Sequence, residues 1–487
     1  MNYRMVFNVL GKTLVILAGL MLLPLIVGIY YQESVIFSFI IPIFGLLAVG
    51  LPLSLLKVRD KSLYAREGFV IVALSWIFLS LVGCLPFIIS GSIPNFFDAF
   101  FETVSGFTTT GASVLTLSTT TISLPKSIMF WRIFTHWIGG MGVLVFMLAV
   151  IPADGGAMHI FRAEAPGPSA SKLVSRMRHT ARILYGIYLV LTVIEVIMLL
   201  FGGMNIYEST LAAFSTAGTG GFSIYGDSMA HYDSVYIQMV VASFMFVFGI
   251  NFNLFYLILI GQFSKAIRSE EFLIYLSIVI VSTLTIAMNL SISFEQSFGE
   301  SLRHAFFQTT SISSTTGFSS QDFIKWPTLS KTILTVLTVI GACGGSTGGG
   351  IKVSRAIMLF KISSNGIKKN LHPRSVHTMK LDGELISKEV ERNTYVYFIL
   401  WVLIVAFSTL VVSFDPACGS DVMTPFSASL TCIGNVGPGM TALIGPFGGF
   451  ATFNGLSKIV LSIVMLAGRL EILPMIILFA PRTWRRG

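Results

Sequence analysis

Residues 313–320 read "SSTTGFSS", and Phe318 is the one bulky apolar residue among them. The chain upstream reads "FLIYLSIVIVSTLTIAM" and the chain downstream reads "TILTVLTVI", so a small polar turn interrupts a strongly apolar sequence. One Ser/Thr/Gly turn between apolar runs is ordinary. This turn decides the fold because it recurs along the chain.

Three other segments repeat the pattern of 304–320, "HAFFQTTSISSTTGFSS". They are "DAFFETVSGFTTTGAS" at 98–113, "TLAAFSTAGTGGFS" at 210–223 and "FSASLTCIGNVGPGM" at 426–440. Each turn follows a short apolar stretch and lies between two longer apolar runs. Because internal repetition on this scale indicates the architecture, we predict four tandem repeats of spanning helix, short helix, turn and spanning helix.

The composition is that of a helical membrane protein. The chain is 54% hydrophobic and 11% charged, with a mean hydropathy of +0.81, whereas soluble domains are about 25% charged. Apolar runs long enough to cross a bilayer lie at 10–31, 36–56, 68–90, 128–152, 183–202, 234–262, 272–292, 328–360, 393–414 and 457–480. The run 328–360 is counted as one broken span.

The predicted fold is therefore an all-α integral membrane protein. It has two N-terminal transmembrane helices and four tandem helix–pore loop–helix repeats in pseudo-four-fold symmetry. The predicted units are 1–66 for the N-terminal pair and 67–160, 161–268, 269–380 and 381–487 for the repeats.

Lysine and arginine are concentrated at one end of the apolar runs. Basic linkers lie at 57–66, 161–182, 264–268 and 361–380, and the chain ends in "PRTWRRG". The positive-inside rule makes this side cytoplasmic and places both termini there. The net charge of +9 follows from this topology, so no nucleic-acid partner is expected.

The four turns have the chemistry of a cation filter. A non-helical backbone at membrane depth is tolerated only where protein buries it or where it lines water, and four loops meeting at an axis satisfy this condition together. Their carbonyl oxygens can replace the hydration shell of a cation, and glycine permits the backbone angles that this requires. The alternative is a set of polar outer loops with ordinary turn residues.

This four-fold plan resembles the potassium-translocating subunits of the Trk/Ktr/HKT superfamily. The resemblance rests on "TTTGAS", "STAGTGGFS", "SSTTGFSS" and "CIGNVGPG" and covers essentially the whole chain. The ten-span layout, with two extra N-terminal helices, is most similar to the TrkH family. The fourth turn departs most from the pattern, because it reads Asn-Val-Gly where two others read Thr-Thr-Gly.

The resemblance implies potassium as the ion and a filter built mostly from backbone carbonyls. The implied filter residues are Thr109, Thr110, Gly111, Thr219, Gly220, Gly221, Thr315, Thr316, Gly317, Asn435, Val436 and Gly437. It also implies a homodimer in the inner membrane of a bacterium. A further implied partner is a cytosolic regulatory subunit, similar to TrkA, that binds nucleotides, while this chain itself binds none.

Residues 341–350 read "GACGGSTGGG", inside an apolar run. Each glycine costs a helix interior about 1 kcal/mol relative to alanine, so we expect this stretch not to be a regular helix. It lacks the GxxxxGK[ST] pattern of a phosphate-binding loop. Close helix packing through small residues is one interpretation. The resemblance favours an intramembrane gate, with Gly344, Gly345, Gly348, Gly349 and Gly350 as its residues.

Among the charged residues inside apolar runs, where a charge is functional by default, Arg469 and Glu195 stand out. Arg469, in "VMLAGRLEILPM", is expected to face the permeation path as a gate or barrier residue, which the resemblance also implies. Alternatively it pairs with Glu471 or extends to the cytoplasmic interface. Glu195, in "YLVLTVIEVIMLLF", has three possible roles: partner in an ion pair, protonated residue of the core, or coupling site.

The main functional hypothesis is potassium uptake through a single-chain pore. A proton- or sodium-coupled carrier is the alternative, although carriers typically show inverted repeats with helices broken at the midplane. A membrane enzyme is disfavoured, because the seven histidines form no recognisable constellation with serine or aspartate.

Overall fold

The computed structural model describes residues 1–58, 65–115, 124–142, 177–372 and 379–484. Within these residues, six helices are long and apolar enough to cross a membrane. They are Tyr3–Tyr30, Ser34–Ser54, Arg66–Ile89, Thr180–Phe201, Glu270–Phe294 and Lys388–Val412. Each coincides with one of the predicted apolar runs, which confirms the interpretation as a multi-pass helical membrane protein.

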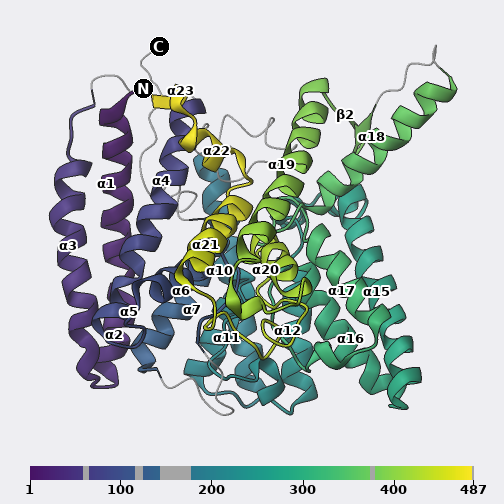
Figure 1. Ribbon diagram of the computed structural model, residues 1–487, viewed down its shortest axis with the longest axis horizontal. Helices are drawn as coiled ribbons and strands as arrows, with labels where there is room; N and C mark the ends of the chain where they lie inside the picture. Colours follow the sequence, from purple (N-terminus) through teal and green to yellow (C-terminus); the bar gives the residue numbers. More distant parts are fainter. Residues whose placement is uncertain (59–64, 116–123, 143–176, 373–378, 485–487) are drawn as a thin grey trace.

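The N-terminal pair packs side by side at one edge of the molecule (Figure 1). Its helices are α1 (Tyr3–Leu20), which continues into α2 (Leu22–Tyr30), and α3 (Phe37–Ser54). Glycines allow the close approach, since a Cβ added to Gly11 would lie 2.6 Å from the Cβ of Leu53.

The rest of the chain forms four successive groups of helices. The first is α4 (Ala65–Gly83), α5 (Leu85–Ile89), α6 (Phe96–Phe107) and α7 (Lys126–Gly140). The second is α10 (Met177–Phe201), α11 (Ile206–Gly218), α12 (Val235–Phe248), α13 (Phe252–Leu259) and α14 (Phe263–Ile267). The third is α15 (Glu270–Phe294), α16 (Phe298–Ser313), α17 (Thr328–Ile340) and α18 (Val353–Leu371). The fourth is α19 (Lys388–Val412), α20 (Met423–Gly434), α21 (Gly455–Arg469), α22 (Leu473–Phe479) and α23 (Pro481–Trp484).

A two-stranded antiparallel hairpin, β1 (Lys380–Leu381) and β2 (Glu384–Leu385), joins the third group to the fourth. The predicted boundary between the first two repeats, at 160–161, lies outside the described residues, as do much of the linker 161–182 and the end of the run 128–152.

In each group, the helix that leads into the repeated turn is too short to cross a membrane. These helices, α6, α11, α16 and α20, have 12, 13, 16 and 12 residues. At about 1.5 Å per residue none spans a hydrocarbon core of roughly 30 Å. Asparagine side chains cap two of their N-termini: Asn95 accepts from the Phe97 amide at 2.8 Å, and Asn205 accepts from the Glu208 amide at 2.8 Å. The predicted short helices are thereby confirmed.

In the second, third and fourth groups the helix that follows the short helix is interrupted, and two of these breaks were not predicted. Residues 234–262 form α12 and α13, bent by 88°, rather than one continuous span. Gly249 lies at this bend against the hydroxyl of Tyr275, and Asn251 caps α13. Residues 457–480 divide into α21 and α22 at Ile472, whose φ is 69°.

The run 328–360 is broken as predicted. Residues 341–352, which we call the glycine-rich segment, separate α17 from α18 and contain no helix. In the first group, α7 ends at Gly140.

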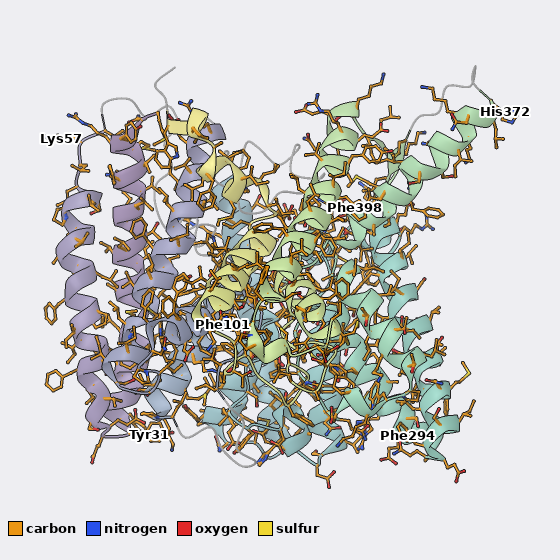
Figure 2. All side chains as sticks on the ribbon, in the orientation of Figure 1. Tyr31, Lys57, Phe101, Phe294, His372 and Phe398 are labelled. Carbon is orange, nitrogen blue, oxygen red and sulfur yellow. The ribbon has the colours of Figure 1, made fainter. Side chains whose placement is uncertain are left out.

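The two ends of the molecule can be followed in the figures. The start of α1 and helix α23 lie at one end (Figure 1), together with Lys57 and His372 (Figure 2). Tyr31 and Phe294 lie at the opposite end, and Phe101 is buried in the interior (Figure 2). The turns after the short helices are buried as well, with Thr109, Thr219, Thr315 and Asn435 all fully buried.

Candidate functional site

The four turns after the short helices share one backbone conformation. The first residue of each turn is left-handed: φ is 54° at Thr109, 55° at Thr219, 62° at Thr315 and 52° at Asn435. Two positions after this residue, each turn has a glycine with φ between 81° and 96°. Asparagine is one of the few residues that tolerate the left-handed region. The fourth turn thus departs in sequence but keeps the conformation.

Gly111, Gly221, Gly317 and Gly437 meet in a closed ring, which we call the glycine ring. A Cβ added to Gly111 would collide with the carbonyl oxygen of Gly220, and one added to Gly221 with that of Thr316. The same holds for Gly317 against the Val436 carbonyl, and for Gly437 against the Thr110 carbonyl at 2.6 Å. Each repeat therefore touches the next, and the fourth touches the first. The carbonyls involved all belong to the residue directly before a ring glycine.

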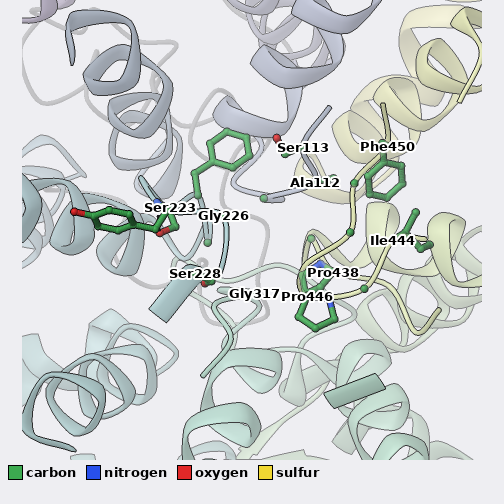
Figure 3. Close-up of a pocket in the computed structure, with 18 of the residues that line it drawn as sticks. Ala112, Ser113, Ser223, Gly226, Ser228, Gly317, Pro438, Ile444, Pro446 and Phe450 are labelled. Carbon is green, nitrogen blue, oxygen red and sulfur yellow. Dashed lines mark hydrogen bonds between the residues drawn. The ribbon is translucent and has the colours of Figure 1, made fainter. Parts of the chain in front are cut away.

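The glycine ring opens into a cavity with about 60 Å³ of room for water-sized molecules. All four ring glycines line it, and Figure 3 shows Ser223 and Gly226 on one side of it and Ile444 and Phe450 on the other. A single buried water needs about 10–15 Å³. The turns therefore border water, which is the condition for irregular backbone at membrane depth.

The hydroxyl and amide side chains of the turns are fully buried. Thr110 and Thr316 bond back to their own turns, through Thr108 at 2.8 Å and Ser314 at 2.7 Å. Asn435 donates to the Thr110 hydroxyl at 2.9 Å, which ties the fourth turn to the first. Among the described residues, the Thr109 hydroxyl and the Asn435 Oδ1 have no hydrogen-bond partner. Oxygens of this kind can contact a partly dehydrated cation.

A buried ion pair holds the first two turns together. The Arg132 Nε donates to Glu102 Oε1 at 2.6 Å, and the two side chains are 2% and 0% exposed. Arg132 also donates to the Ser223 carbonyl at 3.1 Å, and Glu102 accepts from the Val114 amide at 2.8 Å. This pair was not predicted from the sequence. Arg132 lies in the predicted run 128–152, so the rule that singled out Arg469 applied equally to it.

His136, on α7, is a second positioning side chain that the sequence did not single out. Its Nδ1 lies 2.8 Å from the carbonyl oxygen of Gly106, and its Nε2 lies 3.3 Å from the amide nitrogen of Phe222. An imidazole with a proton on Nδ1 and none on Nε2 satisfies both contacts. The imidazole of His136 thus joins the end of the first short helix to the second turn, next to Gly220.

The glycine-rich segment lies against the ends of the third and fourth short helices. The Gly349 amide donates to the Thr315 hydroxyl at 2.6 Å. A Cβ added to Gly348 would lie 2.6 Å from the Ser314 carbonyl, and one added to Gly349 would lie 2.5 Å from the Gly434 carbonyl. Of the remaining predicted gate glycines, Gly344 and Gly345 face the α12–α13 bend and the start of α15, and Gly350 packs on Gly341.

Arg469 reaches the glycine-rich segment. Its guanidinium donates to the Thr347 carbonyl at 2.7 Å, and to the carbonyls of Gly139 and Gly140, at the end of α7, at 2.6 and 2.7 Å. Glu471 forms an ion pair with Arg355. Arg469 thus connects the last repeat, the third repeat and the first.

Glu195 lies in α10 and is fully buried. Neither of its carboxylate oxygens has a hydrogen-bond partner among the described residues.

Comparison with known proteins gives a consistent result over the whole chain. The family model described as "TrkH: Cation transport protein" matches residues 34–293 and 273–486. The Trk system potassium uptake protein TrkH of Salmonella typhimurium is 35% identical over 494 residues, and that of Escherichia coli K12 is 34% identical; both alignments cover 100% of each chain. The crystal structure of the potassium transporter TrkH from Vibrio parahaemolyticus superposes with a TM-score of 0.88 at 33% identity, again covering 100% of each chain.

Proposed function

The chain belongs to the TrkH family of cation transport proteins, and from this premise we propose that it takes up potassium ions through a pore between its four repeats. It is a transport protein and not an enzyme. The observation that carries the proposal is the glycine ring. Four turns of the same conformation bring four backbone carbonyls together beside a water-accessible cavity, which is the chemistry of a cation filter.

The proposed filter comprises the four ring glycines and the two residues before each of them. Carbonyl oxygens replace the water that the ion loses, while the closed contact between neighbouring turns keeps these oxygens at fixed positions. The short helices end at the ring, and the partial negative charge of their C-terminal ends favours a cation there.

The proposed gate is the glycine-rich segment together with Arg469. The segment lies beside Thr315 and Gly434, where an ion leaving the filter would pass. The positive charge of Arg469 beside Thr347 adds an electrostatic barrier to a cation. Opening requires the segment to move away from the ends of the short helices.

The setting of this pore follows from the family and from the charge pattern. We propose the inner membrane of a bacterium, with both termini in the cytoplasm, where the basic linkers lie. The relatives are named as proteins of a potassium uptake system. A homodimer and a cytosolic nucleotide-binding subunit remain the proposed partners.

Rubidium flux into liposomes that contain the purified protein tests this function. A pore predicts rubidium uptake driven by the ion gradient alone, with no need for a proton gradient. A proton-coupled carrier, the second candidate, predicts uptake only with a proton gradient, and a sodium gradient tests sodium coupling in the same way. Absence of both rubidium and potassium flux would overturn the proposal.

A further inference from the structure

One carboxylate bonds to the chain at both ends of the glycine-rich segment: to Gly344 within it and to Ser354, two residues beyond it. Glu271, in the first turn of α15, is 6% exposed. Its Oε1 accepts from the Gly344 amide at 2.6 Å and from the Ser354 amide at 3.1 Å. Gly344 lies near the start of the segment and Ser354 in the first turn of α18. The carboxylate therefore joins the chain entering the segment to the chain leaving it.

The same carboxylate also reaches the bend between α12 and α13. Asn251 Nδ2 donates to Glu271 Oε2 at 3.4 Å, and Asn251 is the cap of α13. The Phe252 amide in turn donates to the Gly345 carbonyl at 3.0 Å. Glu271 thus stands where the second repeat, the third repeat and the glycine-rich segment meet.

The bonds to Glu271 differ in kind from most of the other contacts of the segment. Both oxygens of Glu271 act as acceptors, as those of an ionised carboxylate do, and hydrogen bonds to an ionised group are shorter and roughly twice as strong as neutral ones. The contacts of the segment to Phe248, through the Thr347 hydroxyl at 3.2 Å, and to Thr315 are neutral. The other charge-assisted contacts come from cations: Arg469 to the Thr347 carbonyl, and Lys352 to the Gly348 carbonyl.

We propose that Glu271 is a positioning residue that holds the glycine-rich segment against the short helices by clasping both of its ends. The inference rests on the proposed function, because the position of the segment affects transport only if the segment obstructs a pore. Removal of the carboxylate frees the two ends from α15, and the segment then leaves its place more often.

The neighbouring residue provides a matched control. Glu270 precedes Glu271 in the chain, but its carboxylate pairs with Lys361 at 2.5 Å, with both side chains partly exposed. Glu270→Gln therefore removes the same charge, one residue away, without touching the segment. Glu271→Gln keeps the size of the side chain and one acceptor oxygen, whereas Glu271→Ala removes both oxygens.

Two measurements test the clasp. The first is the open probability and the unitary conductance of single channels in planar bilayers. The second is labelling of Cys343, a buried thiol within the segment, by a water-soluble maleimide in liposomes. For the labelling, the other three cysteines, Cys84, Cys418 and Cys432, are replaced by alanine.

We expect Glu271→Ala to raise the open probability about tenfold or more, which corresponds to about 1.4 kcal/mol, and Glu271→Gln to raise it less. Unitary conductance should not change, because the ring is untouched. Cys343 should label faster in both variants, and Glu270→Gln should behave as the unmodified protein. A loss of folding cannot imitate a gain of open probability.

Unchanged open probability and unchanged Cys343 labelling in folded Glu271 variants would overturn the inference. An equal gain in Glu270→Gln would also overturn it, because the effect would then be one of surface charge. If the unmodified protein conducts no ion at all, the proposed function fails, but faster labelling of Cys343 would still support the clasp.

Discussion

Replacing Gly317 by serine is expected to lower potassium selectivity, because the glycine ring has no room for a Cβ. Gly317 has a φ of 84°, and a Cβ there would collide with the Val436 carbonyl oxygen and lie 2.9 Å from Pro438. The Val436 carbonyl belongs to the proposed filter. The serine can be accommodated only if this oxygen moves.

The size of the effect follows from two contributions. A non-glycine residue in the left-handed region costs about 1–2 kcal/mol, and overpacking a close contact costs roughly 1–3 kcal/mol more. If about 2 kcal/mol of this strain displaces the Val436 carbonyl from its position at an ion site, selectivity for potassium over sodium falls roughly 30-fold.

Gly91 serves as a control that separates the backbone cost from the cost of overpacking. It has a similar φ of 71°, but a Cβ there would meet nothing within 4 Å. Gly91→Ser should therefore lose only the backbone contribution, about 1–2 kcal/mol of stability, with no change in selectivity. The assay is the permeability ratio of potassium to sodium in liposomes or bilayers, together with the melting temperature of each variant. A folded Gly317→Ser protein with unchanged selectivity would refute the filter assignment.

Three further predictions concern charged side chains. Glu102→Ala should destabilise the protein by about 3–5 kcal/mol, because it leaves the Arg132 charge buried without its partner; thermal unfolding measures this, and no loss of stability would contradict the structural importance of the pair. Arg469→Gln should increase rubidium flux, because it removes the barrier charge and the bond to the Thr347 carbonyl; flux equal to that of the unmodified protein would remove Arg469 from the gate. Hydrogen bonds from Thr424 and the Met423 amide lower the pKa of Asp421 in the folded protein. The ionised Asp421 therefore stabilises the fold above the unfolded pKa of about 3.9, and this stabilisation is lost as the pH falls through the lower folded value. Unfolding measured against pH should show this loss in the unmodified protein but not in Asp421→Asn.

Much of the fold could be predicted because it follows from local pattern. Long apolar runs identify spanning helices wherever no tertiary contact breaks them. The recurring turns locate the ends of the four short helices within one or two residues. The glycine-rich segment is non-helical for a reason that its own composition supplies. The 88° bend within 234–262 was not predicted, because nothing local in this apolar run shows that Gly249 must fit against Tyr275.

In the candidate site, too, some residues could be predicted from local sequence and others could not. The ring glycines were found from the repeat, since each turn needs glycine for its own backbone angles. Glu102 was missed because its partner Arg132 is 30 positions away in the chain, and the contacts of Arg132 and His136 with the second turn join different repeats. Asn435 and Thr110, which are hydrogen bonded, are 325 positions apart in the chain.

The sequence by itself determined the class of protein, the four repeats and the residues that could form a filter, because hydropathy and glycine content act within a segment. Only the tertiary structure decided that the four turns close into a ring in chain order. It also decided that Arg469 reaches the carbonyls of Gly139 and Gly140, and that Glu271 joins both ends of the glycine-rich segment. These contacts join residues far apart in the chain, and their geometry exists only when the repeats pack together.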